Sequence, residues 1–442
     1  MSDVACARAA VLTDTQAQLE ASRCLMCENP PCVAACPAQV PVKHFIRAIR
    51  FESPRRAINL IRTQNVFAGI CGLACPVERL CEGACSSTEL SAPIQIGRLQ
   101  HYAAQTELDS GRRGAPGAGT GQKVAIIGGG PSGLAAAAEL ARHGHRPTVF
   151  EKNRRPGGIC TYGVPAHRIP QKLVAGEVDY VTSLGVEIKP NSQLGRDVAL
   201  DGLFQQGFRA VYVAAGAQQA ALPPLPGIEL RGVSTWKQLL DAFSAFNLGE
   251  GPKPNVASSV IIVGGGSVAM DVATVVRQLG TEEIDIVCLE APREMPADRD
   301  ELEEVVAAGA RFHTRALPIE ITGTGGQVNG LKAGRIRWRE PDKFIPSNAE
   351  RIAGTEFWLP GAMVIFAIGA RPAPELGQAL PGVNVDATGR IVINPDTGAT
   401  SRAGVFAGGD AAAGGGTTIV RAVAEGKRAG AAIDAYVQGG AS

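Results

Sequence analysis

The sequence has few aromatic residues, no excess of charge of either sign and no long apolar run. Aromatic residues make up 5% of the 442 residues, and 43 Lys plus Arg face 42 Asp plus Glu, which gives a net charge of +1. Because so balanced a chain has no general field that would recruit nucleic acid or an acidic membrane, we expect it to bind neither. No apolar stretch reaches the length that spans a bilayer.

The N-terminal segment also lacks the features of a secretory signal. Residues 1–24 mix charged and small side chains, without a basic end followed by an apolar run. We therefore expect a cytoplasmic protein, in which clustered cysteines bind metal rather than form disulfides. Glycine is abundant at 54 residues, which is typical of nucleotide-binding α/β domains with tight turns.

Three blocks of different amino-acid composition follow one another along the chain. A cysteine-rich block extends to about residue 107, a polar, glycine-rich linker covers 109–122, and an α/β block begins at Lys123. In the first block, apolar residues recur at helical spacing, which predicts short helices that hold the cysteine loops between them: 42–50, 55–63 and 94–107.

Eight of the eleven cysteines lie between Cys24 and Cys85. The first run has the spacing C-x2-C-x4-C-x3-C followed by a proline, which approximates the run of bacterial ferredoxins: Cys24, Cys27, Cys32 and Cys36. The second run supplies four more thiols: Cys71, Cys75, Cys81 and Cys85. Since thiolates are soft, strong donors for iron, the two runs predict two [4Fe-4S] clusters that exchange one ligand each. Structural zinc sites and disulfides are the alternatives.

The α/β block contains one dinucleotide-binding pattern twice. A short apolar strand at 124–127 precedes the first glycine turn, and a second strand at 260–263 precedes another. Near the C-terminus, one more strand is expected over 405–410 and one more helix over 417–436. The first turn and the start of the helix after it comprise Gly128, Gly130, Pro131, Ser132 and Gly133. Glycines at these positions permit a sharp bend, a close approach of backbone to pyrophosphate and tight packing of helix on strand. Glu151 follows the next predicted strand, 147–150, where a carboxylate accepts from ribose hydroxyls.

The second turn predicts a nicotinamide site with a preference for NADH. Its residues are Gly264, Gly265, Gly266, Ser267 and Val268, and Ala269 replaces the third glycine, which is an accepted variant. The strand predicted at 284–289 is followed by Glu290, whose carboxylate would bind a 2'-hydroxyl and repel a 2'-phosphate. Arg293 is close enough in sequence to reach a phosphate, so NADPH stays open as the alternative.

Over about residues 21–436, the chain resembles the flavin-containing arm shared by dihydropyrimidine dehydrogenase and the small subunit of glutamate synthase. The stretch CGLACPVERLCEGAC at 71–85 and the stretch PIQIGRLQ ending at Gln100 are more similar to dihydropyrimidine dehydrogenase, in particular its bacterial NAD-dependent form. The resemblance implies an α/β fold with a helical N-terminal iron-sulfur domain and two Rossmann-like domains, the NAD domain inserted into the FAD domain. We expect these boundaries: 1–115 for the iron-sulfur domain, 121–225 and 366–442 for the two parts of the FAD domain, and 226–365 for the NAD domain.

The resemblance also implies a ligand set for each cluster. One cluster would be bound by Cys24, Cys27, Cys32 and Cys85. The other would be bound by Cys36, Cys75, Cys81 and the side-chain oxygen of Gln100. Cys71 is then a neighbour and not a ligand, which differs from the count of eight thiol ligands that spacing alone suggests.

The same resemblance extends the two nucleotide sites. FAD at the first turn would also meet Glu151, Lys152, Gly158, Ile159 and Arg168, and further along the chain Gly409, Asp410, Thr417 and Thr418. A simple turn or helix cap is the alternative role for Asp410. NADH would lie over the second turn and reach Ala367, Ile368 and Gly369.

These expectations predict an enzyme that oxidises NADH through FAD and passes the electrons through two [4Fe-4S] clusters. Hydride transfer needs no acid or base side chain, so we name no catalytic residue. No barrel domain follows the α/β block, so we expect an FMN and iron-sulfur partner subunit, in a heteromer, to reduce uracil or thymine. A glutamate synthase small subunit, another electron-input subunit and a zinc-binding scaffold without turnover are the competing hypotheses.

Overall fold

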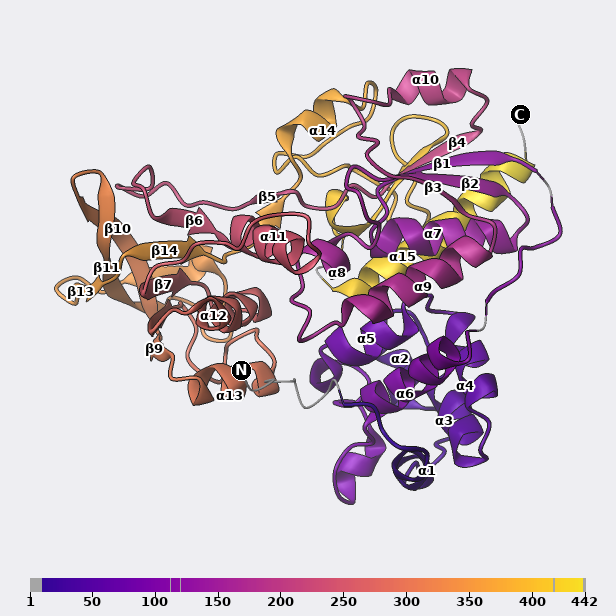
Figure 1. Ribbon diagram of the computed structural model, residues 1–442, viewed down its shortest axis with the longest axis horizontal. Helices are drawn as coiled ribbons and strands as arrows, with labels where there is room; N and C mark the ends of the chain where they lie inside the picture. The colour runs from indigo at the N-terminus through magenta and orange to yellow at the C-terminus, as the bar shows by residue number, and fades with distance from the viewer. Residues whose placement is uncertain (1–9, 112, 120, 416–417, 440–442) are drawn as a thin grey trace. The chain divides into compact units, whose positions relative to one another are not determined.

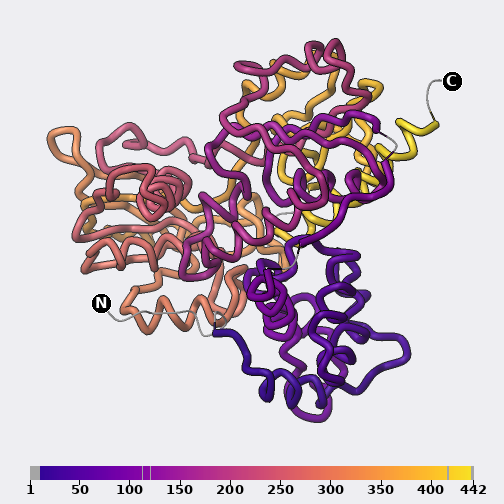
Figure 2. Tube along the Cα trace, turned by 45° about the vertical axis from the view of Figure 1, so that its right-hand side comes forward, coloured from indigo at the N-terminus to yellow at the C-terminus, as the bar shows by residue number. Residues whose placement is uncertain are grey.

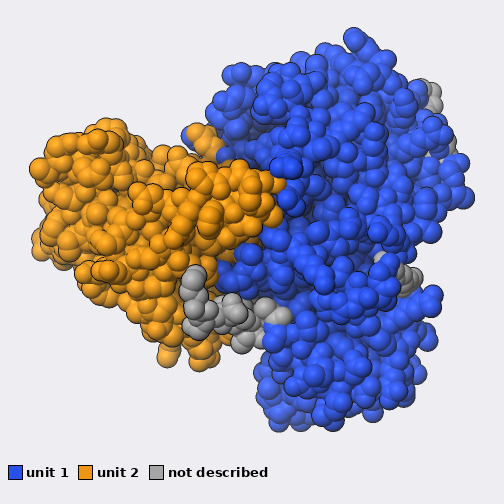
Figure 3. Space-filling model, in the orientation of Figure 1, with its two compact units in different colours: residues 1–161, 166–218, 371–442 blue, residues 162–165, 219–370 orange. Residues whose placement is uncertain are grey.

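The computed structural model describes residues 10–111, 113–119, 121–415 and 418–439. The chain folds into two compact units, coloured in Figure 3: residues 1–161, 166–218 and 371–442 form unit 1, and residues 162–165 and 219–370 form unit 2. Unit 2 is inserted between two parts of unit 1, as the predicted fold class requires. The unit boundaries fall at 218/219 and 370/371, and the cysteine-rich block shares unit 1 with the first Rossmann-like domain.

The N-terminal block of unit 1 is helical, as predicted. On α3 the side chains of Val42, Phe45, Ile46 and Ile49 are buried, because spacings of three and four residues place them on one helix face. The three predicted helices are confirmed as α3, α4 and α6, with ends that differ by up to two residues. The helices are α1 (Asp14–Ser22), α2 (Pro31–Ala34), α3 (Val42–Arg50), α4 (Pro54–Arg62), α5 (Ala68–Ala74) and α6 (Ile96–Asp109).

The first Rossmann-like domain is built on a parallel sheet with strand order β16-β4-β1-β2-β3. Helices α7 and α15, far apart in sequence, lie side by side (Figures 1 and 2), and a Cβ at Gly426 of α15 would come within 2.0 Å of the Ser132 carbonyl oxygen. The elements are β1 (Lys123–Ile127), α7 (Pro131–Arg142), β2 (Arg146–Phe150), α8 (Ile159–Tyr162), α9 (Gln171–Ser183), β3 (Glu187–Lys189), α10 (Leu200–Gln205), β4 (Ala210–Val213), α14 (Pro374–Gln378), β16 (Val405–Ala407) and α15 (Ile419–Gln438).

Unit 2 contains a second parallel sheet, with strand order β6-β14-β7-β8-β9, and a smaller antiparallel sheet formed by β10, β11, β12 and β13. Its elements are β6 (Val233–Thr235), α11 (Trp236–Asn247), β7 (Ser259–Val263), α12 (Ser267–Leu279), β8 (Glu283–Val287), α13 (Arg299–Ala307), β9 (Arg311–His313), β10 (Ala316–Thr324), β11 (Gln327–Trp338), β12 (Ala349–Arg351), β13 (Phe357–Pro360) and β14 (Met363–Phe366). The short pair β5 (Gln219–Ala220) and β15 (Ala370–Arg371) completes the strands.

Two predicted strands were too long. The strand expected over 284–289 ends at Val287 as β8, and the strand expected over 405–410 ends at Ala407 as β16. In the second case Gly409 has a φ of +64°, a left-handed conformation that ends the extended backbone and starts a 3₁₀ turn. Both predictions extended the strand beyond the residue at which its hydrogen-bonded pairing with neighbouring strands ends.

Candidate cofactor-binding sites

Four thiols of the helical block line one cavity, which we name cavity 1. Cys24 follows α1, Cys27 lies in the next loop, Cys32 belongs to α2, and Cys85 precedes a 3₁₀ turn. Lys43 of α3 anchors this loop, because its Nζ donates to the carbonyl oxygen of Cys27 at 2.9 Å. The structure therefore brings together the residues predicted for one cluster, and their binding of iron stays a prediction.

A second cavity, cavity 2, is lined by the residues predicted for the other cluster and by one more thiol: Cys36, Cys75, Cys81, Gln100 and Cys71. Gln100 is buried on α6, and its Nε2 donates to the carbonyl oxygen of Ala68 at 2.6 Å. This bond engages the amide nitrogen, so the oxygen Oε1 is the acceptor that the side chain can offer. Because Cys71 lines the same cavity, the choice of Gln100 over Cys71 as a ligand stays a prediction.

The two cavities are adjacent, but their surroundings differ. Ile96, at the start of α6, lines both of them. Val420, from α15 of the Rossmann-like domain, lines cavity 2, whereas the lining of cavity 1 comes from residues 24–96. Cavity 2 is therefore the one that adjoins the first dinucleotide-binding domain.

Burial favours the protonated form of Cys32 and Cys36. It raises the pKa of Cys36, and it raises the pKa of Cys32 to about 11, with repulsion from Cys85 as the next cause. Within the described residues, no three His, Cys, Asp or Glu side chains converge as the ligands of a single metal ion do. Thiols grouped in this way become thiolates when bound cations compensate their charge, and soft sulfur donors in this number suit iron-sulfur clusters.

The first glycine turn, between β1 and α7, is closely packed. Gly128 has a φ of +105°, and a Cβ there would lie 2.4 Å from the carbonyl oxygen of Ala214. A Cβ at Gly133 would lie 1.9 Å from the carbonyl oxygen of Gly128. Pro131 and Ser132 form the buried start of α7. Only glycine fits at both ends of this turn. Since the first N–H groups of a helix have no partner within it, the start of α7 is suited to phosphate oxygens.

Further predicted FAD contacts gather at the same turn. A Cβ at Gly158 would lie 2.7 Å from the Cα of Gly130, so the loop before α8 approaches the turn backbone to backbone. Glu151, directly after β2, is buried and accepts a hydrogen bond from the N–H of Gly129 at 2.7 Å. Burial raises the pKa of Glu151, and hydrogen bonds from backbone N–H groups act in the opposite direction. Because Gly130 and Gly158 both lack a side chain, this side of the turn consists of backbone.

The other residues predicted along FAD are less closely grouped. The Nζ of Lys152 donates to Gln218 Oε1 at 2.6 Å, and Ile159 begins α8 with 40% of its surface exposed. Arg168 precedes α9 and is half-buried beside His167, whose pKa is lowered to about 4 by burial. Contact of these side chains with FAD stays a prediction.

The late segment returns to the first turn. Gly409 and Asp410 follow β16, and a Cβ at Gly409 would lie 3.1 Å from the Cβ of Ser132. Burial raises the pKa of Asp410 to about 6. Thr418 is the N-cap of α15, and Thr417 lies outside the described residues. Gly409 is thus beside one of the predicted early FAD contacts, and Asp410 is the next residue in the chain.

The second glycine turn, in unit 2, repeats the geometry of the first. Gly264 has a φ of +140°, and a Cβ there would lie 2.4 Å from the carbonyl oxygen of Ala367. Gly266 is the N-cap of α12, which begins with Ser267 and Val268. The turn therefore presents a helix N-terminus of the kind that binds a pyrophosphate.

The acid predicted to select the nucleotide lies at this turn. A Cβ at Gly265 would lie 2.8 Å from Glu290 Oε2. Burial raises the pKa of Glu290, and the charge of Arg315 acts against that rise. Arg315 is engaged with Glu294, from Nη2 to Oε1 at 2.5 Å, and Arg293 is exposed. The carboxylate of Glu290 thus lies close to the backbone of the turn.

The last predicted nicotinamide contacts follow β14. Ala367 meets the second turn as described, and Ile368 is 43% exposed. The carbonyl oxygen of Gly369 accepts from the indole Nε1 of Trp236 at 3.2 Å and from the N–H of Ala221 at 2.9 Å. These bonds fix the backbone beside the turn, and contact with NADH stays a prediction.

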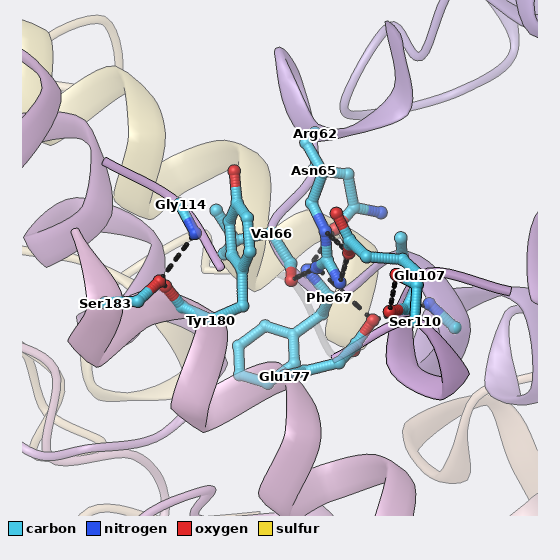
Figure 4. A network of polar contacts seen from close by, with 12 residues as sticks. Arg62, Asn65, Val66, Phe67, Glu107, Ser110, Gly114, Glu177, Tyr180 and Ser183 are labelled. Carbon is cyan, nitrogen blue, oxygen red and sulfur yellow. Dashed lines mark hydrogen bonds and ion pairs between the residues drawn. The ribbon is translucent and has the colours of Figure 1, made fainter. Parts of the chain in front are cut away.

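A buried network that sequence reasoning missed joins the helical block to α9 (Figure 4). Arg62 of α4 donates to Glu107 of α6, from Nη2 to Oε2 at 2.8 Å, and its Nη1 lies 3.4 Å from Glu177 Oε1. The Arg62 guanidinium also lies 4.3 Å from the ring centroid of Tyr180. Two carboxylates and a ring therefore compensate one buried cation.

Glu177 connects this network to cavity 2. Its Oε1 accepts from the N–H of Gly69 at 2.7 Å, at the start of α5, the helix that carries Cys71 and leads into Cys75. Burial raises the pKa of Glu177 to about 7, although Arg62 and the backbone donors favour the charged form. Glu177 stands within an apolar stripe of α9, and a carboxylate in such a stripe is the signal that could have identified it.

Two family models match the chain. One, described as dihydropyrimidine dehydrogenase domain II, 4Fe-4S cluster, matches residues 5–112. The other, described as pyridine nucleotide-disulphide oxidoreductase, matches residues 122–426.

Proteins of similar sequence include subunits of several enzymes. The small chain of NADPH glutamate synthase from Escherichia coli K12 is 33% identical over 94% of this chain and 90% of its own. The NAD-dependent dihydropyrimidine dehydrogenase subunit PreT of the same strain is 32% identical over 96% of this chain and 95% of its own. The NADP-dependent formate dehydrogenase subunit beta of Moorella thermoacetica is 33% identical over 93% of this chain, which spans 60% of that relative's length.

Solved structures support the fold of the α/β block. FprA of Mycobacterium tuberculosis, solved with NADPH, superposes with a TM-score of 0.61 at 18% identity, over 72% of this chain and 85% of its own.

In the part of the chain that the structure describes, no helix is both long and apolar enough to cross a bilayer.

Proposed function

The chain belongs to the pyridine nucleotide-disulphide oxidoreductase family, and from this premise we propose that it is the electron-input subunit of an NAD-dependent dihydropyrimidine dehydrogenase. It is an NAD(P)H-dependent flavin and iron-sulfur oxidoreductase of the kind that includes PreT and glutamate synthase small chains. Several of its relatives are subunits, which implies a partner for this chain. The proposal adds NADH as the donor and an FMN subunit that reduces uracil or thymine as the partner.

One observation carries the proposal: the thiols of the helical block line two adjacent cavities, and cavity 2 adjoins the domain with the first glycine turn. FAD at that turn supplies the conversion of a two-electron hydride into single electrons for one-electron carriers. We propose cavity 2 as the first acceptor site and cavity 1 as the second. Each cavity offers four of the proposed ligands, so both fit a [4Fe-4S] cluster.

The residues that hold FAD act by position and charge. The N-terminus of α7 would hold the pyrophosphate, and the carboxylate of Glu151, which accepts from the Gly129 N–H, would accept from the ribose hydroxyls. The close pair Gly130 and Gly158 lets the cofactor lie against backbone, where any side chain would block it. Asp410 would hold the ribityl chain from the opposite segment.

The donor preference rests on Glu290. Because its carboxylate lies beside the backbone of the second turn, it favours a 2'-hydroxyl and repels a 2'-phosphate. We therefore expect kcat/KM for NADH to exceed that for NADPH by at least tenfold, with ferricyanide as the acceptor. The variant Glu290→Ala should narrow this ratio, mainly through a lower KM for NADPH. A wild-type preference for NADPH would contradict the assignment.

The partner is tested by co-purification under anaerobic conditions, followed by assay with NADH and uracil. We expect an FMN-containing chain to co-purify and the complex to form dihydrouracil. Recovery of a glutamate synthase large subunit, with glutamate formation instead, would replace the pyrimidine assignment and leave the electron-input role in place.

A further inference from the structure

The last turn of α3, the first turn of α4 and the loop between them form a strongly basic surface. We name it the basic patch and define it by five residues: Arg47, Arg50, Phe51, Arg55 and Arg56. All four arginines are exposed, and within the described residues none of them takes part in an ion pair. Phe51 is 68% exposed, and the Arg47 guanidinium lies 6.0 Å from its ring centroid. Glu52 is the only acid between residues 43 and 56, although the whole chain has a net charge of +1.

The basic patch adjoins cavity 1. Helix α3, which ends in the patch, contributes Val42, Lys43 and Ile46 to the wall of that cavity. Leu25, also in the cavity wall, is 48% exposed. Cavity 1 is therefore close to the molecular surface, and part of its wall belongs to the helix that ends in the patch.

We propose that the basic patch is the docking surface for the electron-accepting partner, and that the partner presents an acidic surface around its own redox centre. This inference rests on the proposed function, in which cavity 1 is the last carrier in the chain. Arginine and aromatic side chains are enriched in protein interfaces, and the patch combines both kinds. Complementary charge speeds encounter and orients the partner, so the patch would bring an acceptor to cavity 1.

The test uses a protein acceptor of known charge, because the partner itself is not identified. Cytochrome b5 is an acidic haem protein that accepts one electron, and cytochrome c is a basic one. We expect the second-order rate of cytochrome b5 reduction by NADH-reduced protein to fall steeply with added salt, and cytochrome c to be the poorer acceptor at low salt. In Arg55→Glu/Arg56→Glu, the low-salt rate with cytochrome b5 should fall by about tenfold or more. The Kd from isothermal titration should rise in parallel.

The choice of variant limits damage to the fold. Arg55 and Arg56 lie in the first turn of α4, where acidic side chains are compatible with the helix dipole. The matched control is Arg146→Glu/Arg209→Glu, which changes the net charge equally at two exposed arginines outside the helical block. It should keep the wild-type rate with cytochrome b5. Phe51→Ala should weaken binding without removing its salt dependence.

Three outcomes separate the hypotheses. Absence of ferricyanide reduction by wild type would refute the proposed electron-input function itself. Normal ferricyanide reduction, with equal cytochrome b5 rates in the patch and control variants, would refute the patch alone. Binding of wild type to vesicles of anionic lipid, lost in Arg55→Glu/Arg56→Glu while the cytochrome b5 rate is unchanged, would overturn the proposal in favour of a membrane surface.

Discussion

Cavity 1 and cavity 2 are lined by the same type of side chain, but they are held in place by different neighbours. Cavity 1 is formed within the helical block, and its thiols are half-buried. Cavity 2 has buried thiols at Cys71 and Cys75, takes one wall residue from α15, and lies at the end of a helix that Glu177 anchors. The difference indicates a direction: cavity 2 is built into the contact with the flavin domain, and cavity 1 is close to the surface.

The largest expected effect is the loss of a cluster from each cavity in turn. Cys75→Ser should remove about half of the iron and also lower the thermal midpoint, because cavity 2 supports the contact between α5 and α9. Cys27→Ser should remove a similar share of the iron with a smaller loss of stability and normal FAD content. Iron, FAD and the midpoint are measured on anaerobically purified protein.

The matched control for Cys75→Ser is Cys71→Ser, four residues earlier on α5, the helix whose C-cap is Cys75. We expect it to keep both clusters by iron analysis, because Gln100 is the proposed fourth ligand. Loss of iron in Cys71→Ser, together with full iron in Gln100→Leu, would reverse this ligand assignment.

The next largest effect is expected from the buried cation of the contact with α9. Arg62→Leu leaves two buried carboxylates without their cation. This should lower the free energy of unfolding by about 3–5 kcal/mol. As a control, Arg299→Leu removes an exposed pair with Glu303 and should cost less than about 1 kcal/mol. Thermal midpoints at one fixed scan rate compare the two variants. Similar midpoints would show that the network does not support the contact.

A pH-dependent effect of intermediate size is expected at Glu177. Its pKa in the fold is raised from 4.5 to about 7, so its stabilising contribution is greatest below pH 4.5 and is lost as the pH rises through 7. The neutral variant Glu177→Gln lacks this loss. Relative to wild type, we expect the free energy of unfolding of this variant to rise by up to about 3 kcal/mol between pH 5 and pH 8. The plots of thermal midpoint against pH for the two proteins should therefore converge or cross. Parallel curves would contradict the assigned pKa.

The smallest expected effect concerns the loop of cavity 1. Lys43→Met removes the charged donor to the carbonyl oxygen of Cys27, which should cost about 1.5–3 kcal/mol. Iron should then be lost faster in air from cavity 1, while the share held in cavity 2 is unchanged. The decay of the cluster absorbance in air measures the rate of iron loss. Equal acceleration of this loss at both cavities would argue against the account in which different residues support the two cavities.

Much of the local structure could be predicted because short-range patterns determine it. The apolar spacing over 42–50 matches α3, and the two glycine turns occur where strand, glycines and helix follow one another. The ferredoxin-like spacing already predicted that each run gives one ligand to the other cluster, which groups Cys36 with Cys75, and both line cavity 2. Spacing could not indicate Gln100, which reaches that cavity because α6 packs against α5, and the family resemblance supplied this residue instead.

Long-range polar contacts escaped prediction altogether. Arg62 and Glu177 are far apart in sequence, and nothing near either residue indicates its partner. The antiparallel sheet β10–β13 was also missed, because its longest strand, β11, has an irregular burial pattern rather than strict alternation. These features depend on packing between elements, which local periodicity does not record.

Metal and flavin analysis of the wild-type chain, purified without oxygen, tests the central claim most directly. The account predicts about eight iron atoms and about one FAD per chain, as two [4Fe-4S] clusters and one flavin site require. Zinc in place of iron, or a chain that takes up no FAD when the cofactor is supplied, would contradict it.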